Sequence, residues 1–227
     1  RPDGTFVRDL TGFAIGGMRI DLPFVQDTSK YLVFSVPASF QLLPAPGSLR
    51  VFDDRLEPLE IDLYDTKTWT KYGWDVTNDK DFPSEFSLPE QKAADQYFAN
   101  VLGRAKRLHE ALAAANGKSV GVDFYTVGCD CKKDTPDGVV IYRDAKADKW
   151  KTLFRAKGFT RSDGHKFTDD DLKKVIHSPG DGIVPIRSLE AKTQSVRVGV
   201  ASIYDVQETK LICQDHNKQF ANSMIQD

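Results

Sequence analysis

The feature that most constrains the fold is a long helix-forming segment that leads directly into a valine-rich segment. Residues 89–115 consist largely of strong helix formers, which predicts one long helix. Its expected buried face, with spacings of three and four, comprises Ala93, Tyr97, Val101, Ala105, Leu108 and Leu112. Asn116-Gly117 is a typical helix end, and residues 120–128 predict a short strand. A helix followed at once by such a strand is an α/β unit, so we expect an α/β fold with this strand central and parallel.

Other segments predict short elements separated by turns. The expected helical turns are Pro37–Pro44 and Asp65–Trp69, the expected strands or hairpins are Val51–Leu63, Val139–Tyr142, Trp150–Phe159 and Ser195–Val206, and the expected polar loop is Cys129–Gly138. Trp69, Tyr72 and Trp74 form an aromatic cluster with two interpretations. It is either local core or part of a lid whose side chains contact a substrate in an apolar pocket.

The composition is that of an ordinary globular protein. The 227 residues are 40% hydrophobic and 28% charged, and the net charge of −2 comes from acids and bases that are mixed along the chain. The sequence shows no basic face of the kind that would indicate a nucleic-acid partner. No apolar run approaches the roughly 18 residues that a membrane-spanning helix needs, so we expect no transmembrane segment.

Three cysteines, Cys129, Cys131 and Cys213, are too few for a disulfide scaffold. Cys129-Asp130-Cys131 could supply two zinc ligands, but no second pair stands at ligand spacing. We therefore expect structural or free thiols, no metal and no cofactor. The cysteine count slightly favours a reducing compartment such as the cytoplasm.

The segment from His177 to Ser188 carries the clearest candidate chemistry. In its Pro-Gly-Asp-Gly turn, two glycines flank Asp181, so the backbone can turn tightly around one carboxylate. His216 follows 35 residues later, before an expected short helix. A carboxylate can orient an imidazole, fix its tautomer and stabilise the imidazolium. An acid followed by a histidine is the second half of the Ser…Asp…His order of α/β-hydrolases.

The serine of such a triad is the missing part. Gly117-Lys118-Ser119-Val120-Gly121 fits the pentapeptide of a nucleophile elbow, and Ser119, Asp181 and His216 stand in the right order. An elbow, however, needs a strand before the serine and a helix after it, whereas the helix here comes first. We therefore disfavour Ser119 as the nucleophile.

Four stretches of the chain resemble the lecithin:cholesterol acyltransferase-like branch of the α/β-hydrolases. They are Val36–Pro44 (with Pro-Ala-Ser-Phe-Gln-Leu-Leu-Pro), Leu63–Trp69 with Tyr72-Gly73-Trp74, Gly180–Leu189 (with Gly-Asp-Gly-Ile-Val-Pro-Ile-Arg-Ser), and His216 with the helix after it. Their order and separations also match, from about Phe13 onward. The resemblance implies that Asp181 and His216 are the catalytic acid and base. It places the nucleophilic serine upstream of the proline-rich stretch, on an elbow that this chain does not contain.

The resemblance therefore implies the C-terminal part of an α/β-hydrolase fold: a cap or lid region at 1–88, then the last helices and strands of the core at 89–227. The chain begins at Arg1 without a methionine, which is consistent with a cleaved product or a part of a longer protein. The expected activity is that of a serine ester hydrolase or acyltransferase. Its substrate would be a carboxylic, and in particular a lipid, ester, and an N-terminal segment of the same protein would supply the serine. Two alternatives stay open: a shortened hydrolase that uses Ser119, and a catalytically inactive binding module with the same scaffold.

Overall fold

The computed structural model describes residues 34–75, 77, 87–114, 123–144, 147–189, 192–195, 198–202 and 206–221. The helices that the described residues form are η1 (Pro37–Leu42), α3 (Thr66–Tyr72), α5 (Leu88–Ala114), α6 (Asp169–Ile176), α7 (Ile186–Leu189) and η3 (His216–Ala221). The strands are β1 (Arg50–Phe52), β2 (Phe124–Gly128), β3 (Lys132–Pro136), β4 (Gly138–Asp144), β5 (Lys149–Leu153), β6 (Phe159–Thr160), β7 (Lys166–Phe167), β8 (His177–Gly180), β9 (Lys192–Ser195), β10 (Val198–Ser202) and β11 (Val206–Leu211).

A three-stranded sheet with the order β1-β4-β5 lies between two apolar clusters that the described residues form. β4 pairs with β1 in parallel and with β5 in antiparallel orientation. Alternate residues of β4 point to opposite faces, so Val139 and Ile141 belong to one cluster and Val140 to the other. Because both faces are covered, the first residues of β4 form a continuous apolar run.

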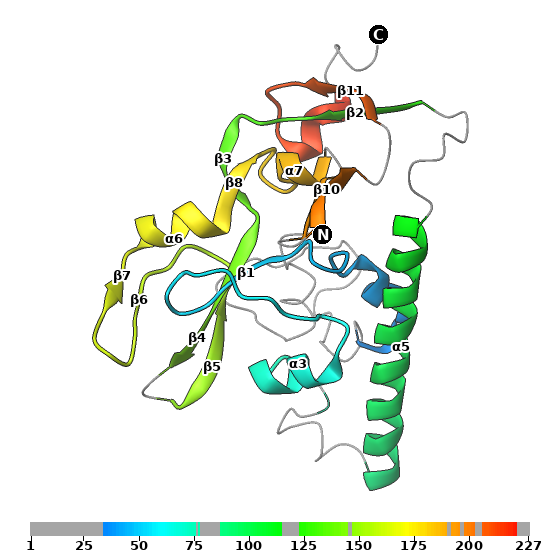
Figure 1. Ribbon diagram of the computed structural model, residues 1–227, viewed down its shortest axis with the longest axis vertical. Helices are drawn as coiled ribbons and strands as arrows, with labels where there is room; N and C mark the ends of the chain where they lie inside the picture. Colours follow the sequence, from blue (N-terminus) through cyan, green and yellow to red (C-terminus); the bar gives the residue numbers. More distant parts are fainter. Residues whose placement is uncertain are drawn as a thin grey trace.

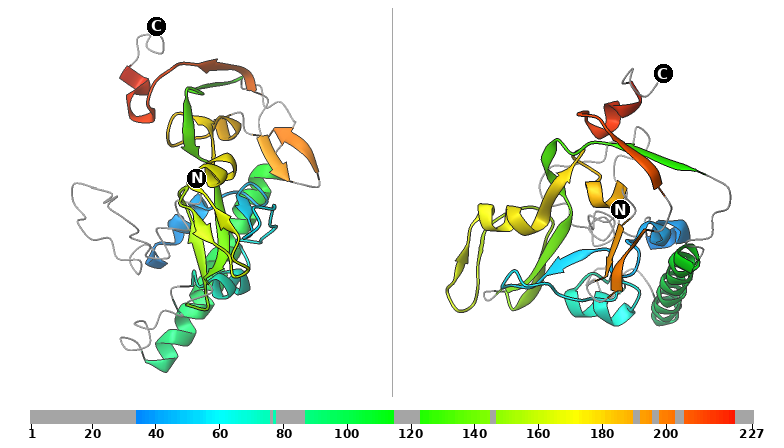
Figure 2. Two further views of the ribbon diagram at one scale, coloured as in Figure 1. Left: turned by 90° about the vertical axis from the view of Figure 1, so that its left-hand side faces the viewer. Right: turned by 45° about the horizontal axis from the view of Figure 1, so that its top comes forward.

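The larger cluster joins η1, α3 and α5 to one face of this sheet. Its members include Phe40, Trp69, Trp74, Phe98 and Leu102, all of which are nearly inaccessible to solvent. The smaller cluster packs α6 and the β6–β7 hairpin on the other face. Figures 1 and 2 show α5 along one side of the molecule and the β6–β7 hairpin on the opposite side of β4 and β5.

The predicted long helix is confirmed, since α5 spans Leu88–Ala114. Its buried face is wrong in part: Leu108 and Leu112 are 37% and 44% exposed, and Ala93 is exposed. The residues that α5 buries are Phe98, Val101, Leu102 and Ala105. The middle of α5 therefore supplies the core contacts, whereas its last turns extend beyond the surface that η1 and α3 provide.

Two small strand pairs form the end of the molecule that carries the candidate site (Figure 1). β2 pairs with β11 in parallel, as expected for a strand that follows a helix, but among the described strands these two form a sheet by themselves, so β2 is not the central strand that the sequence predicted. β3 pairs with β8 in antiparallel orientation, so the prediction of a polar loop over Cys129–Gly138 is wrong. β3 lacks apolar alternation because only Thr135 within it is fully buried, and hydrogen bonds to β8 hold it in place.

The sequence-based domain boundary at 88/89 does not separate two cores. Phe40 and Trp69 belong to the same cluster as Phe98 and Ile141, so described residues on both sides of the boundary pack together. The described strands form one three-stranded and four two-stranded sheets, and the larger sheet of an α/β-hydrolase stays a prediction. Within the described part of the chain, no helix has the length and apolarity to cross a membrane.

Candidate functional site

The loop that carries Asp181 closes on itself through its own backbone. The Asp181 N–H donates to the carbonyl oxygen of Val184 (3.2 Å), and Gly180 forms an isolated bridge with Pro185. Gly182 has φ +91°, a conformation that side-chain-bearing residues rarely adopt. The predicted tight turn is therefore present, and its second glycine, Gly182, is needed because the backbone there has a positive φ.

The buried side chain of Thr135 in β3 holds this loop in place through a hydrogen bond. Its Oγ1 accepts a hydrogen bond from the Gly182 N–H (2.9 Å). A Cβ at Gly180 would lie only 2.7 Å from Thr135 Oγ1 and would also collide with the Val184 carbonyl. Gly180 thus permits the close approach between β3 and β8 on which the position of the Asp181 loop depends.

A buried ionic network anchors the other end of the loop. Asp137, whose side chain is 1% exposed, accepts from Arg187 Nε at 2.5 Å and from Arg50 Nη1 at 2.9 Å. Arg187 also donates to the carbonyl oxygens of Ser48 and Asp137. Since Arg187 belongs to the same segment as Asp181, the network ties the acid loop to β1 and to the start of β4.

His216 is positioned by the parallel β2–β11 pair. The Ile212 N–H donates to the Gly128 carbonyl at 2.7 Å, which carries the pairing one residue past β11. The chain then reaches η3, where the His216 N–H donates to the Asp181 carbonyl oxygen (3.3 Å). The side chains meet as well: His216 Nδ1 lies 2.8 Å from Asp181 Oδ2. The structure thus brings together the two residues that the sequence nominated.

Three further groups hold the Asp181 carboxylate. Oδ1 accepts from the backbone N–H groups of Ile183 (2.9 Å) and Val184 (2.7 Å), and Oδ2 accepts from Gln219 Nε2 (2.8 Å). Gln219 is buried, and our sequence reasoning did not identify it. The available signal was its spacing of three residues from His216 at the start of an expected helix, which places both side chains on one face.

Burial and hydrogen bonding oppose each other at Asp181. Burial by itself raises the pKa of this carboxyl group, but the N–H groups of Val184 and Ile183 and the neighbouring His216 outweigh it and lower the pKa. The group is therefore ionised at neutral pH and can only accept hydrogen bonds, so the proton between the two side chains resides on His216 Nδ1. In the neutral ring, Nε2 then carries the lone pair.

The arrangement can accept a proton at a defined atom. The His216 side chain is 42% exposed, and Nε2 has no hydrogen-bond partner among the residues that the structure describes. A hydroxyl group or a water molecule that approached Nε2 could transfer its proton there, and Asp181 would stabilise the resulting imidazolium. Ser119 lies outside the described residues.

The aromatic cluster belongs to the core rather than to a binding surface. Trp69, Tyr72 and Trp74 are 1%, 4% and 2% exposed. Trp69 Nε1 donates to the Leu63 carbonyl and Trp74 Nε1 donates to Thr152 Oγ1, so both indole N–H groups are satisfied internally. Of the two sequence-based interpretations, local core fits these positions, and substrate contact does not.

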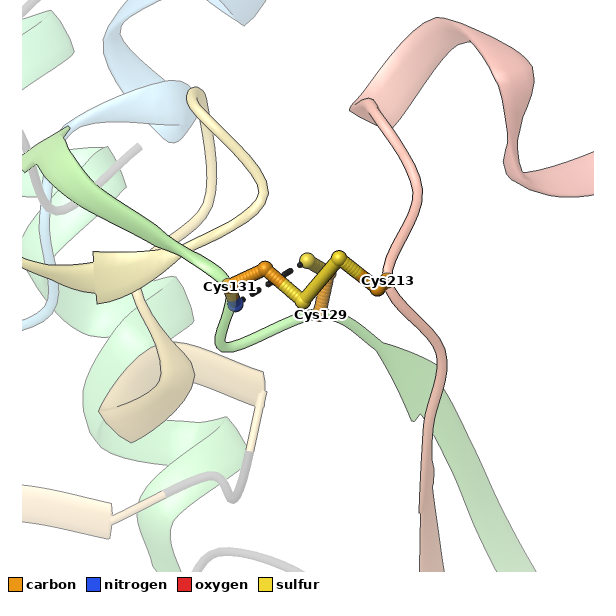
Figure 3. A group of neighbouring side chains, drawn as sticks. All are labelled: Cys129, Cys131 and Cys213. Atoms are coloured by element: carbon orange, nitrogen blue, oxygen red, sulfur yellow. Dashed lines mark hydrogen bonds between the residues drawn. A yellow bond between two sulfur atoms is a disulfide. The ribbon is translucent and has the colours of Figure 1, made fainter.

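The three cysteines converge at the start of β3, and their sulfur atoms all lie within 4.8 Å of one another (Figure 3). This is the only metal-compatible group among the described histidine, cysteine and acidic residues. Cys131 and Cys213 form a disulfide, and Cys129 is a buried free thiol. Disulfides are typical of oxidising compartments, which is opposite to the preference that the cysteine count suggested.

Comparison with protein-family models, with curated proteins and with solved structures gave no match for this chain.

Proposed function

We propose that Asp181 and His216 are the acid and the base of an acyl-transfer site, and that a serine outside this chain supplies the nucleophile. The observation that carries the proposal is the 2.8 Å contact between His216 Nδ1 and Asp181 Oδ2, with the carboxylate held by further donors. The His216 side chain is 42% exposed, and Nε2 is the ring nitrogen on the side away from the acid. It is the arrangement that a general base in a triad requires.

In the proposed reaction, Nε2 of His216 takes the proton of the serine hydroxyl as the oxygen attacks a carboxylic ester. The imidazolium then gives that proton to the leaving alcohol, and an acyl-serine remains. Water or an acceptor alcohol subsequently attacks the acyl-serine, with His216 again as the base. The resemblance to the lecithin:cholesterol acyltransferase-like hydrolases favours a lipid ester as the substrate and an upstream segment of the same protein as the source of the serine.

The first measurement is the intact mass, under denaturing conditions, of the native protein that contains this chain. A second polypeptide, or a mass well above 25.4 kDa, is expected, because the proposal needs a segment that carries the serine. That material is then treated with a fluorophosphonate, which labels activated serines. We expect the label on a serine of the segment that carries the nucleophile, and no labelling of the 227-residue chain by itself.

Variants test whether the labelling depends on Asp181 and His216, which together are called the dyad below. Asp181→Asn and His216→Gln should slow labelling by a factor on the order of 10³ or more, because the base loses its orientation or is absent. The matched controls are Asp163→Asn and His165→Gln, which change the same residue types on the exposed β6–β7 turn. Unchanged labelling in the dyad variants would contradict the proposal.

A second contradicting result would involve Ser119. Labelling of the isolated chain that disappears in Ser119→Ala would assign the nucleophile to this chain and would replace the proposal by the shortened-hydrolase alternative.

A further inference from the structure

The cysteine cluster lies where the histidine segment joins the rest of the site. Cys129 directly follows β2, Cys131 directly precedes β3, and Cys213 lies three residues before His216. Figure 3 shows the Cys129 sulfur beside the bond that joins Cys131 to Cys213. A free thiol is thus held next to a disulfide, with all three sulfur atoms within 4.8 Å of one another.

The register of the β2–β11 pair shows why Cys213 has two candidate partners. Leu211 is paired with Gly128. If this parallel register continued by two residues, Cys213 would lie opposite Asp130, midway between Cys129 and Cys131. The strands diverge after the bond from the Ile212 N–H to the Gly128 carbonyl. The backbone therefore presents Cys213 to both cysteines of the Cys-Asp-Cys sequence.

The local hydrogen bonding also prepares Cys129 for reaction. The Cys131 N–H donates to Cys129 Sγ at 3.2 Å, so a donor points at the sulfur that would carry negative charge during an attack. The same contact keeps that sulfur near the disulfide. Cys129 is 2% exposed, and burial shields the thiol from external thiols and oxidants but not from its two neighbours.

We propose that Cys129, Cys131 and Cys213 form an intramolecular thiol–disulfide exchange site. The thiolate of Cys129 attacks Cys213 Sγ. The Cys131–Cys213 bond breaks, a Cys129–Cys213 bond forms, and the leaving Cys131 thiolate takes up the proton that Cys129 gave up. One disulfide and one thiol are present before and after the step, so it needs no oxidant or reductant.

The exchange changes how the histidine segment is attached. The three sulfur atoms lie within 4.8 Å of one another, so the exchange moves the attachment point of Cys213 by at most about that distance along the loop between β2 and β3. The His216–Asp181 contact exists in the Cys131–Cys213 linkage. In the Cys129–Cys213 linkage the attachment point is displaced toward β2, and His216 moves away from Asp181.

Disulfide mapping tests the exchange without any activity assay. The reduced native protein is reoxidised with glutathione disulfide, quenched with acid at intervals, unfolded, and treated with N-ethylmaleimide to block free thiols. Cleavage on the amino side of aspartate separates Cys129, in a peptide 123–129, from Cys131, in a peptide 130–133. Mass spectrometry then identifies which of them is joined to Cys213. Both linkages are expected, in a ratio that is the same whether the protein starts reduced or oxidised.

Two single variants complete the test. Cys131→Ser should form the Cys129–Cys213 bond, and the matched control Cys129→Ser should form only the Cys131–Cys213 bond. The ring-nitrogen NMR shifts of His216 should show a protonated, hydrogen-bonded Nδ1 in Cys129→Ser and the loss of that signature in Cys131→Ser.

Three outcomes would overturn the exchange proposal. The first is wild-type protein with only the Cys131–Cys213 bond at every time point. The second is Cys131→Ser protein in which the two remaining thiols stay free. The third is purified protein that retains stoichiometric zinc with all three thiols reduced, because that would make the cluster a metal site. None of these outcomes depends on whether the site transfers acyl groups, so the two proposals fail independently.

Discussion

Replacing Asp137 with asparagine should destabilise the protein far more than an ordinary surface change. The Asp137 carboxylate is 1% exposed and lies between Arg187, whose side chain is 12% exposed, and Arg50, whose side chain is 31% exposed. Asparagine preserves the shape of the side chain but removes its charge. Two guanidinium groups would then face a neutral amide, and that of Arg187 would do so largely out of contact with solvent.

The magnitude follows from the unequal burial of the two arginines. Removing one partner of a buried pair costs about 3–5 kcal/mol, because the remaining charge stays desolvated without compensation. We expect Asp137→Asn to lie in that range. Arg50→Met should cost about 1 kcal/mol, because water screens this more exposed pair. Arg187→Met should fall between the two at about 2–3 kcal/mol, since Asp137 would keep Arg50 as a partner.

The assay is urea denaturation of the protein that contains this chain, followed by the fluorescence of the buried tryptophans Trp69 and Trp74. Urea is preferable to guanidinium chloride because it leaves ionic interactions unscreened. Asp170→Asn, which breaks an exposed pair with Lys173 on α6, is the control and should leave the urea midpoint unchanged. A loss below about 1 kcal/mol for Asp137→Asn, or an equal loss for Arg50→Met and Arg187→Met, would refute the argument.

Two further predictions concern the Asp181 loop. Gly182→Ala should lower the free energy of unfolding by about 1–3 kcal/mol, because φ is +91° at this position. Gly164→Ala is the matched control, with φ +87° in the β6–β7 turn, and should lower the free energy of unfolding by a similar amount in urea denaturation. Only the Gly182 variant should slow fluorophosphonate labelling. The lowered pKa of Asp181 means that its contribution to stability is complete above the ordinary aspartate pKa of about 4 and is lost as the pH falls through the lowered value. Urea midpoints between pH 6 and pH 2 should therefore fall less steeply in Asp181→Asn than in wild type, and equal slopes would contradict this assignment.

The sequence predicted the elements that local composition determines. α5 begins and ends within one residue of its predicted limits, because helix formers fill it and a helix-ending dipeptide follows it. β4 was recognisable from the apolar run Val139–Tyr142, whereas β5 ends at Leu153 and so covers only the first part of the predicted strand or hairpin over Trp150–Phe159. The partly wrong buried face of α5 has a different cause. Which turns of a long helix are covered depends on η1 and α3, and sequence periodicity does not contain their positions.

The site was predictable in its chemistry but not in its supports. Asp181 and His216 were found from residue types, turn residues and chain order, and those signals are local. Thr135 and Asp137 lie in a segment that was predicted to be a loop, and their roles depend on the pairing of β3 with β8 and on arginines distant in sequence. Such contacts leave no periodic signal. The disulfide was missed for the same reason, since its cysteines stand 82 residues apart.

The two residues of the candidate dyad are held by attachments of different strength. Asp181 is fixed by its own turn, by Thr135 and by the buried Arg187–Asp137 pair, all within the packed part of the molecule.

His216 depends on connections nearer the surface: the disulfide at Cys213, the half-exposed ion pair of Asp215 with Lys132, and the bond from its own N–H to the Asp181 carbonyl. The acid is therefore the fixed reference of the site, and the histidine is the part that can be displaced. A change that moves the histidine can break the 2.8 Å contact without unfolding the core. The cysteine cluster is positioned to make such a change, because it acts on the histidine segment and leaves the supports of the acid intact.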